Sequence, residues 1–268
     1  MIDLSIIIVN WNTCALLRDC LHSVLASAVP LSVEIILVDN GSTDGSAEML
    51  KQEFGTTRLI QNKENTGFAR ASNQGIAIAT GRYVLLLNSD TVVKPRALAG
   101  LVAFLDSHAE VGVVGPRLLK TDGELQEYAF GNDPSLGYLL RRGLTRLLFK
   151  RALHDWGTNR VQSVDWVSGA CLMARRAAID QVGLLDENVF LYFEDNDWCL
   201  RFRRAGWQVF YNPQVEIIHL GGQSLAQNPA ARRAYYRSLD HFYAKHYGPL
   251  ARWILRLSLM PYRWLVRN

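Results

Sequence analysis

Short apolar runs alternate with helical patterns along the first ninety residues of the chain. The runs are rich in β-branched residues and predict strands over residues 5–10, 34–39, 58–62 and 83–88. The spacing of apolar positions between them predicts helices over residues 14–25, 46–54 and 67–79. Strands separated by helices in this way pair in parallel through right-handed crossovers. This half of the chain is therefore expected to be α/β.

The remaining elements follow in a less regular order. Helices are expected from Pro95 to residue 107 and over residues 176–182 and 195–205, and strands over residues 111–114, 164–174, 207–211 and 215–219. Gly206 stands where a helix C-terminal cap is expected. Residues 121–159 contain glycines and basic residues, and we expect an irregular insertion there that is mobile or faces lipid.

Polar residues follow three of the predicted strands, at residues 10–12, 39–42 and 88–90. The carboxyl ends of parallel strands meet at one edge of a sheet, where α/β proteins bind their ligands. Each segment alone is also an ordinary turn, because Asn, Asp, Ser and Gly are turn formers. Their shared position favours a ligand site.

A second polar cluster places Glu194, Asp195 and Asp197 within four residues. Adjacent carboxylates repel one another, so such clusters are often kept for catalysis or for binding a cation. The alternative is a helix start, where acidic side chains complement the helix dipole. Nearby aromatic residues are expected either to stack on sugar rings or to fill the core: Trp166, Phe190, Tyr192, Phe193 and Trp198.

The chain has the composition of a globular protein, and its four cysteines show no paired or metal-binding spacing. We expect free thiols in the reducing cytoplasm. The apolar run at residues 4–9 is preceded by Asp3 and is too short for a signal peptide, so it is expected to be a buried strand.

The net charge of +4 conceals a basic C-terminal segment. Residues 230–268 contain eight Lys or Arg and one acid, Asp240, a net charge of +7 that leaves −3 for the rest. Within residues 249–268, four arginines share a narrow helical stripe among apolar residues: Arg252, Arg256, Arg263 and Arg267. This pattern favours a peripheral helix at a membrane interface, broken at Pro261; a helix docked on the protein itself is the alternative.

Residues 139–151 form a second basic and apolar stretch that supports the membrane interpretation. We do not expect nucleic acid as a partner, because the body of the protein is acidic.

Several motifs, in order, resemble those of glycosyltransferase family 2. In the first half they are residues 5–12, 38–46, 65–75 and 87–90; in the second half residues 168–171, 183–201, 205–207 and 219–224 resemble the bacterial rhamnosyltransferase-like branch. The resemblance implies a GT-A fold, a single α/β domain with a mixed sheet over residues 1–228. Its halves would bind the nucleotide sugar (1–95) and the acceptor (96–228), with basic amphipathic helices at 229–268.

The resemblance also implies a donor site for a UDP- or dTDP-sugar. The residues matching it are Asn10, Trp11, Asp39, Asn40, Asn65, Arg70, Asn73, Asn88, Ser89 and Asp90. A carboxylate such as Asp39 can accept the imide N–H of a pyrimidine base, and Arg70 is expected to reach the diphosphate. A turn-forming role is the alternative for Asp39.

Asp90 and His219 match the metal ligands of the family, which implies a divalent cation, Mg²⁺ or Mn²⁺. The family motif is Asp-any-Asp, whereas this chain has Asn88 at the first position. Metal affinity is then lower, or Asn88 contacts the ribose instead. The alternative for His219 is a buried structural histidine.

The expected reaction is an inverting displacement that needs a general base. By position in the motif that base is Asp195, with Glu194 orienting the acceptor, while Asp197 is expected at the helix start in a structural role. We expect a rhamnosyltransferase-like enzyme at the inner face of the membrane that uses a lipid-linked or polymeric glycan. An inactive scaffold is the alternative, and a phosphoryl transferase would need a Gly-rich phosphate loop that the sequence lacks.

Overall fold

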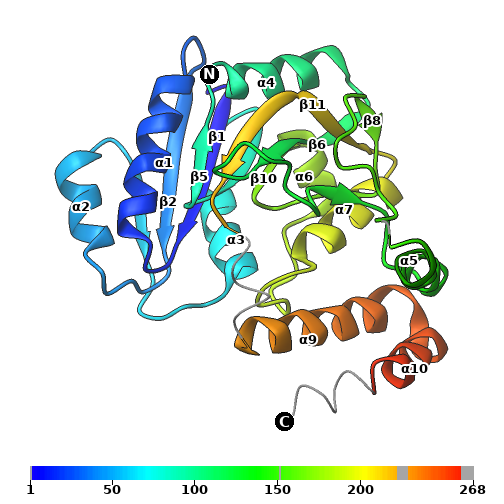
Figure 1. Cartoon of the computed structure of the whole chain (residues 1–268). Coiled ribbons are helices and arrows are strands. Elements are labelled where there is room, and N and C mark those ends of the chain that lie inside the picture. Colours follow the sequence, from blue (N-terminus) through cyan, green and yellow to red (C-terminus); the bar gives the residue numbers. More distant parts are fainter. Residues whose placement is uncertain (1, 151, 222–228, 261–268) are drawn as a thin grey trace.

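A central mixed sheet organises the part of the chain that the computed structural model describes, residues 2–150, 152–221 and 229–260 (Figure 1). The described strands form a nine-stranded sheet in the order β3-β2-β1-β4-β10-β6-β11-β5, with β8 also paired to β11. Their bounds are β1 Leu4–Asn10, β2 Val33–Asp39, β3 Arg58–Gln61, β4 Tyr83–Asn88, β5 Thr91–Val93, β6 Val111–Leu119, β8 Gln162–Ser163, β10 Cys171–Arg175 and β11 Gln208–His219. The expected α/β architecture is confirmed.

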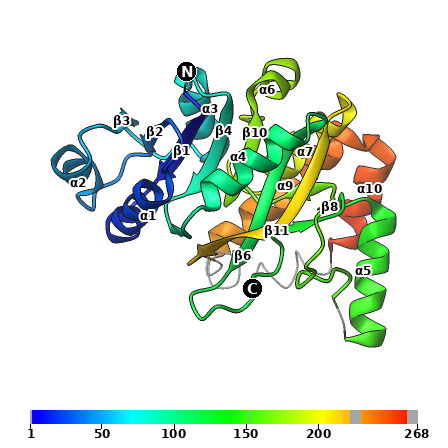
Figure 2. The same cartoon turned by 90° about the horizontal axis from the view of Figure 1, so that it is seen from above.

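Strands β1 to β4 are parallel, and β1, β2 and β4 are almost fully buried at their centres, whereas the edge strand β3 is partly exposed. The register sets Asn10 opposite Asp39 and Val9 opposite Asn88, so the polar strand ends meet at one edge as predicted. Helices α1 (Cys14–Ser27), α2 (Ser46–Glu53) and α3 (Phe68–Ile78) connect these strands. Right-handed crossovers place α1 and α2 on one face of the sheet and α3 on the other (Figure 2).

The second half extends the same sheet. Strand β10 runs antiparallel to β4 and β6, β11 runs parallel to β6, and β5 runs antiparallel to β11, which makes the sheet mixed. The pairing of β5 with β11 sets His219 opposite Thr91. Three further helices cover this half: α4 (Ala97–Ser107), α6 (Arg176–Val182) and α7 (Glu194–Arg204).

Two strand predictions are wrong in detail. The strand expected over residues 164–174 is divided into β9 (Trp166–Val167), which pairs with β7 (Phe130–Gly131) outside the main sheet, and β10. The break at residues 168–170 forms a loop beside α7. The strands expected at 207–211 and 215–219 are one strand, β11, whose pairing with β6 shifts register between Asn212 and Glu216. A bulge absorbs the extra residues without ending the strand.

The irregular insertion expected at residues 121–159 is also wrong, because it contains the helix α5 (Leu136–Phe149). Ser135 caps this helix by accepting a hydrogen bond from the backbone N–H of Tyr138 at 3.2 Å. Two glycines, Gly137 and Gly143, weakened the helical signal in the sequence.

Helices α9 (Pro229–His246) and α10 (Gly248–Ser258) lie beside the sheet domain at the side where α5 also lies (Figures 1 and 2). They share a second hydrophobic cluster with α7 and the residue before it: Phe193, Leu200, Leu239, Phe242, Tyr243 and Leu255. Leu136 and Leu139 of α5 pack against the same cluster. The three helices are thus attached to α7 and the sheet domain through one small core.

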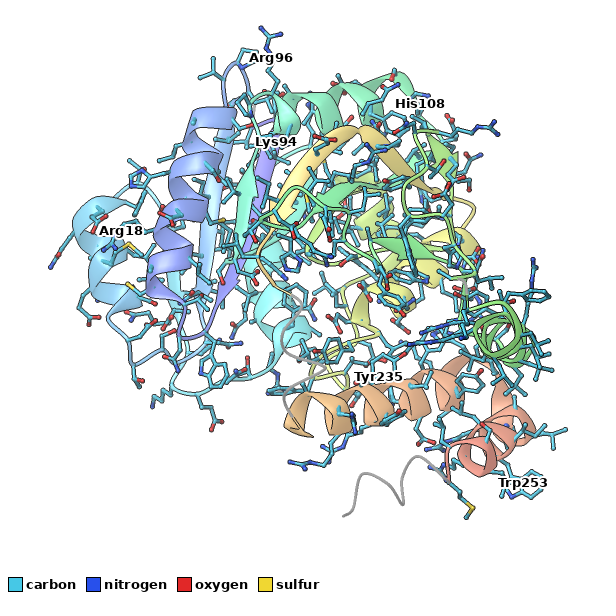
Figure 3. The ribbon with its side chains drawn as sticks, in the orientation of Figure 1. Arg18, Lys94, Arg96, His108, Tyr235 and Trp253 are labelled. Atoms are coloured by element: carbon cyan, nitrogen blue, oxygen red, sulfur yellow. The ribbon has the colours of Figure 1, made fainter. Side chains whose placement is uncertain are left out.

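Helix α10 combines features of both interpretations of the basic segment. Arg252 and Arg256 each donate to Asp240 of α9, with closest contacts of 2.6 Å, so this part of the arginine stripe docks on the protein. Leu250 and Trp253 are 70% and 60% exposed, and Figure 3 shows Trp253 pointing away from the molecule. Arg263, Arg267 and the break expected at Pro261 lie outside the described residues. No helix in the described part of the chain is long and apolar enough to cross a membrane.

Candidate active site

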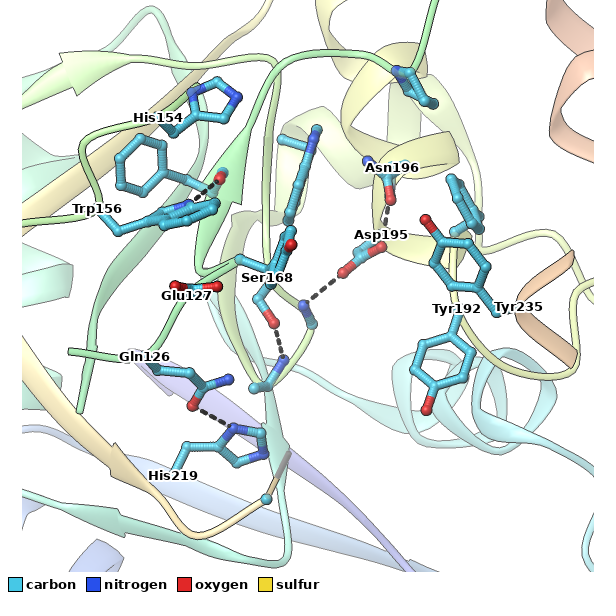
Figure 4. A pocket seen from close by; sticks show the side chains of 18 of the residues that line it. Gln126, Glu127, His154, Trp156, Ser168, Tyr192, Asp195, Asn196, His219 and Tyr235 are labelled. Carbon is cyan, nitrogen blue, oxygen red and sulfur yellow. Dashed lines mark hydrogen bonds between the residues drawn. The ribbon is translucent and has the colours of Figure 1, made fainter. Parts of the chain in front are cut away.

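A large cavity opens where the two halves of the sheet meet, and two groups of predicted site residues line it (Figure 4). Asn88, Asp90 and His219 lie at one end, and Glu194 and Asp195 lie at the other. The cavity measures about 1760 Å³. Small-molecule pockets usually hold about 300–1,000 Å³, so this cavity has room for a donor and an acceptor together.

Asp90 and His219 are brought together by the pairing of β5 with β11. Nε2 of His219 lies 3.2 Å from Oδ1 of Asp90, and the backbone N–H of Leu220 donates to the carbonyl oxygen of Asp90 at 2.8 Å. Nδ2 of Asn88 lies 3.2 Å from the same Nε2. Asn88 therefore faces the Asp90–His219 pair although it lacks the charge of the family residue.

Gln126 holds the ring of His219 from behind. Its Oε1 lies 2.8 Å from Nδ1 of His219 and can accept a hydrogen bond from that nitrogen, which directs Nε2 toward Asp90. Ligand histidines of metal sites are oriented by a second hydrogen bond of this kind. No sequence motif points to this role of Gln126, which lies in the segment that we expected to be irregular.

The donor atoms at this end fit a Mg²⁺ or Mn²⁺ ion that is also bound by a diphosphate. Within the described residues no three His, Cys, Asp or Glu side chains gather to enclose a metal. Mg²⁺ is commonly held by one or two carboxylates together with substrate phosphates, so Asp90 and His219 suffice in number. Gly221 keeps the site open, because a Cβ there would lie 2.6 Å from Oδ2 of Asp90.

Glu194 and Asp195 begin helix α7 directly after a strained turn. Tyr192 and Phe193 have φ values of 66° and 69°, in the left-handed region that residues other than glycine rarely adopt. Such strain persists only where surrounding contacts impose it. Helix α9 supplies them: the Tyr235 ring lies 5.0 Å from that of Phe193, and Oγ of Ser238 donates to the carbonyl oxygen of Leu191 at 2.8 Å.

The two carboxylates differ in their hydrogen bonds. Asp195 accepts from the backbone N–H of Gly169 at 2.9 Å and from that of Asn196 at 2.8 Å. Burial raises the pKa of Asp195, and these two N–H groups oppose that rise. Glu194 is only 6% exposed, and its Oε2 has no hydrogen-bond partner within the described structure. Burial, and then the charge of Asp195, raise the pKa of Glu194 well above its usual range.

The pKa of each carboxyl group is raised, so the pair can hold one proton near neutral pH. The two N–H groups that bond Asp195 favour the proton on Glu194 and the charge on Asp195. A protonated Glu194 can donate a hydrogen bond to an acceptor oxygen, and an ionised Asp195 can take its proton.

Asp197 points to α9 and takes no part in the cavity lining. It contacts Arg201 at 2.8 Å, Lys245 at 2.7 Å and His246 at 2.6 Å. Although burial raises the pKa of Asp197, the bonds from His246 and Lys245 outweigh it and lower the pKa to about 2. This geometry agrees with the structural role expected for Asp197.

Three of the residues expected to bind the nucleotide, Asn10, Asp39 and Asn40, lie at the ends of β1 and β2, outside the cavity lining. Asn10 donates to Asp39 at 3.1 Å, and Asp39 accepts from the backbone N–H of Ser42 at 3.1 Å. Asn40 donates to Asn65 at 3.2 Å. Asn10, Asp39 and Asn40 are each no more than 2% exposed. In this conformation their side chains order the loops, and contact with the donor stays a prediction.

Three further residues expected to bind the sugar donor, Arg70, Asn73 and Ser89, form hydrogen bonds or ion pairs with other parts of the chain. Arg70 pairs with Glu187 at 3.0 Å, and Asn73 bonds both the backbone of Leu185 and Glu187. Oγ of Ser89 lies 2.9 Å from Oγ1 of Thr13.

Trp11, at the end of β1, is 54% exposed and free to stack on a ring. Among the other aromatic candidates, Trp198 is fully buried, and Phe193 packs on α9 as well as lining the cavity with Trp166 and Tyr192. Trp198 therefore fills the core, and stacking of a sugar on the cavity-lining rings stays a prediction.

The chain is similar to several known proteins. The sequence profile of Glycosyl transferase family 2 matches residues 5–169. An N-acetylglucosaminyl-diphospho-decaprenol L-rhamnosyltransferase of Mycobacterium tuberculosis is 31% identical over 263 residues, which cover 88% of this chain and 83% of the relative.

Two solved structures share the fold. A mannosyltransferase from Pyrobaculum calidifontis, in complex with GDP-Man and Mn²⁺, has a TM-score of 0.59 and 16% identity over 98% of this chain and 83% of its own. The S. aureus protein TarS, residues 1–349, has a TM-score of 0.56 and 18% identity, and the match covers 79% of this chain and 60% of the TarS chain.

Proposed function

The chain belongs to glycosyltransferase family 2 and is a glycosyltransferase, and we propose that it moves a sugar from a pyrimidine nucleotide to a lipid-linked acceptor by an inverting, metal-dependent reaction. The observation that carries this proposal is the position of two pairs on one cavity. The Asp90–His219 pair would hold the leaving diphosphate, and the Glu194–Asp195 pair would hold the acceptor hydroxyl.

In this mechanism Asp195 takes the proton of the acceptor hydroxyl as its oxygen bonds to the anomeric carbon of the sugar. The bond between that carbon and the diphosphate breaks on the opposite face, so the configuration inverts. Protonated Glu194 donates to the acceptor and keeps its oxygen aimed at the sugar. Asp90 and His219 would hold a divalent cation, which would neutralise the charge of the departing diphosphate.

The donor end has weaker support. The residues that match the family's nucleotide motifs surround the ends of β1 and β2, and Trp11 is the exposed one. A pyrimidine base at this edge would approach the Asn10–Asp39 pair, with its sugar directed at the cavity. We propose dTDP-rhamnose as the first donor to test, because the Mycobacterium tuberculosis relative is an L-rhamnosyltransferase.

The acceptor proposed is a sugar on a polyprenyl diphosphate, as the name of that relative suggests. Helices α5 and α10 support membrane contact at the inner face of the cell membrane. Both present exposed apolar side chains: Leu140, Leu144, Leu147, Leu148, Leu250, Trp253 and Leu257. Peripheral contact through residues 249–268 would bring the enzyme to its acceptor.

A turnover assay tests this function. The purified protein is incubated with Mn²⁺, N-acetylglucosaminyl polyprenyl diphosphate and either dTDP-rhamnose or a set of UDP-sugars, and the lipid product is weighed by mass spectrometry. Addition of one sugar by the wild type, with none by Asp195→Asn, supports the proposal. No product from any donor, by protein shown to be folded, would count against it.

A further inference from the structure

Three arginines line the active-site cavity together with the carboxylates of Glu194 and Asp195. Arg142 and Arg146 come from α5 and Arg232 comes from α9, and the mechanism above uses none of them. Arg142 is half-buried, and the other two are exposed. Cations gathered at the mouth of a cavity suit an anionic ligand.

Helix α5 has a basic side, with Arg142 and Arg146, and an apolar side. At about 100° per residue, Arg142 and Arg146 fall close together, and Leu140, Leu144, Leu147 and Leu148 fall on the opposite side. Those four leucines are 46–76% exposed. The helix has no acidic residue. It therefore has one side for the cavity and one for an apolar medium such as lipid.

Arg142 is oriented by two tyrosines. Its Nη2 donates to the hydroxyl of Tyr128 at 3.2 Å, and its guanidinium lies 5.3 Å from the centre of the Tyr128 ring. It also acts electrostatically on Tyr235, the residue that packs on Tyr192 and Phe193 beside the catalytic carboxylates. A guanidinium has five N–H donors, so most of those of Arg142 remain available to a ligand.

Within the described residues, Arg142, Arg146 and Arg232 form no ion pair with a carboxylate. Other basic residues, such as Lys120, Arg203 and Arg252, do form one. Glu124 and Glu127 also line the cavity, but Glu124 pairs with Lys120 at 2.9 Å. Glu127 lies beside Gln126 and Trp156 (Figure 4) and lines a small neighbouring pocket with Arg142 and Arg146, but within the described residues it forms no ion pair with either.

We infer that Arg142, Arg146 and Arg232 bind the diphosphate of the lipid-linked acceptor, at a second anion site apart from the donor site at Asp90 and His219. This inference rests on the proposed function. Guanidinium groups bind phosphate oxygens in pairs, which gives position as well as affinity.

The geometry gives each part of such an acceptor its own place. The reacting hydroxyl lies at Asp195, the sugar lies against Tyr192 and Tyr235, and the diphosphate meets the arginines beyond them. If the leucine side of α5 enters the membrane surface, the arginines stand at the level of the lipid headgroups. A lipid diphosphate is held at that level, so it can reach the site while its chain stays in the bilayer.

The test is a calorimetric titration of the full chain with farnesyl diphosphate, in the presence of Mn²⁺ and a saturating nucleoside diphosphate that fills the donor site. The wild type should bind. Arg142→Gln, Arg146→Gln and Arg232→Gln should each weaken binding by about tenfold, the usual size for a hydrogen bond between charged groups. Arg141→Gln is the matched control, because Arg141 is an exposed arginine of α5 outside the cavity lining, and it should bind as the wild type does.

Inorganic pyrophosphate separates a lipid diphosphate from a free anion and should bind at least about tenfold more weakly than farnesyl diphosphate. Equal binding of the two probes would overturn the assignment to lipid. Failure of the wild type to bind farnesyl diphosphate, or equal losses in Arg141→Gln, would overturn the site itself. Nucleotide affinity is measured separately and should not change in the arginine variants, so failure of the donor site is recognised independently.

Discussion

The backbone N–H of Gly169 donates a hydrogen bond of 2.9 Å to Oδ2 of Asp195. Gly169 lies in the loop that breaks the strand expected at residues 164–174, so the break has a chemical consequence. The loop turns one N–H toward the carboxylate that we assign as the base. That bond favours the ionised form of Asp195 and fixes its direction.

Replacing this base should stop turnover while sparing the donor site. We expect Asp195→Asn to lower kcat by about 10²–10⁴-fold, the usual contribution of a general base. Calorimetry should show unchanged affinity for the nucleoside diphosphate. Asp180→Asn, at an exposed position on α6, is the control and should keep full activity. Near-normal turnover by Asp195→Asn would show that another group is the base.

The raised pKa of Glu194 should affect the free energy of unfolding and its dependence on pH. The pKa of Glu194 is raised from 4.5 in the folded protein, so folding favours the protonated form. Its contribution is then most favourable below pH 4.5 and is lost as the pH rises toward the folded pKa. Glu194→Gln lacks this loss, and we expect it to be more stable than the wild type at pH 8 by about 1–3 kcal/mol, the cost of an unpaired buried polar group.

Urea unfolding of both proteins at pH 5 and pH 8 measures this difference. The stability advantage of Glu194→Gln should grow with pH. A constant or shrinking advantage would mean that Glu194 is ionised in the folded protein at both values.

Asp197 should behave in the opposite way, because Arg201, Lys245 and His246 surround its carboxylate. The side chain is 2% exposed, and removal of its charge takes an anionic partner from Arg201 and leaves Lys245 paired with Asp186 alone. Breaking a buried ion pair typically costs about 3–5 kcal/mol, and we expect Asp197→Asn to lose stability on that scale at pH 7. Asp180→Asn should lose almost none.

The pH dependence follows from the pKa of Asp197, lowered from 3.8 to about 2. A lowered pKa contributes stability above the unfolded value, and that contribution is lost as the pH falls through the folded one. The gap between wild type and Asp197→Asn should therefore be complete at pH 5 and narrower at pH 3. If the difference in unfolding free energy between the two proteins does not depend on pH, the charge of Asp197 does not cause it.

The apolar side of α10 should bind membranes. Trp253 and Leu257 are 60% and 42% exposed, and burial of such side chains in lipid is favourable by about 1.5–3 kcal/mol each at full depth. The double variant Trp253→Ser and Leu257→Ser should sediment with phosphatidylglycerol vesicles about tenfold less well. Leu25→Ser, at a 45% exposed position on α1, is the control. Equal sedimentation of all three proteins would exclude α10 as the anchor.

The regular part of the fold could be predicted from the sequence because its signals are local. Strands β1, β2 and β4 are continuous apolar runs that end in polar turns, and helices lie between them at the expected places. Parallel pairing then brings the strand ends together. In the second half the signals are weaker, since β7, β8 and β9 have only two residues each and depend on long-range pairing.

The candidate site divides in the same way. Asp90, His219, Glu194 and Asp195 carry recognisable motifs, and the structure places them on one cavity. Their supporting contacts come from residues whose chemistry is ordinary: the N–H of Gly169, the amide of Gln126 and the ring of Tyr235. Such contacts depend on which loops and helices meet in space, and no local pattern in the sequence encodes that.

The most direct test of the account is calorimetric binding of UDP, dTDP, GDP and ADP to the wild type, with and without Mn²⁺. The account predicts Mn²⁺-dependent binding of a pyrimidine diphosphate that is lost in Asp90→Ala. Gln126→Leu should weaken that binding by about 10–100-fold because His219 loses its orienting bond, whereas Gln208→Leu, at an exposed position on the same strand as His219, should not. Failure of folded protein to bind any of the four nucleotides, or metal-dependent binding that persists in Asp90→Ala, would contradict it.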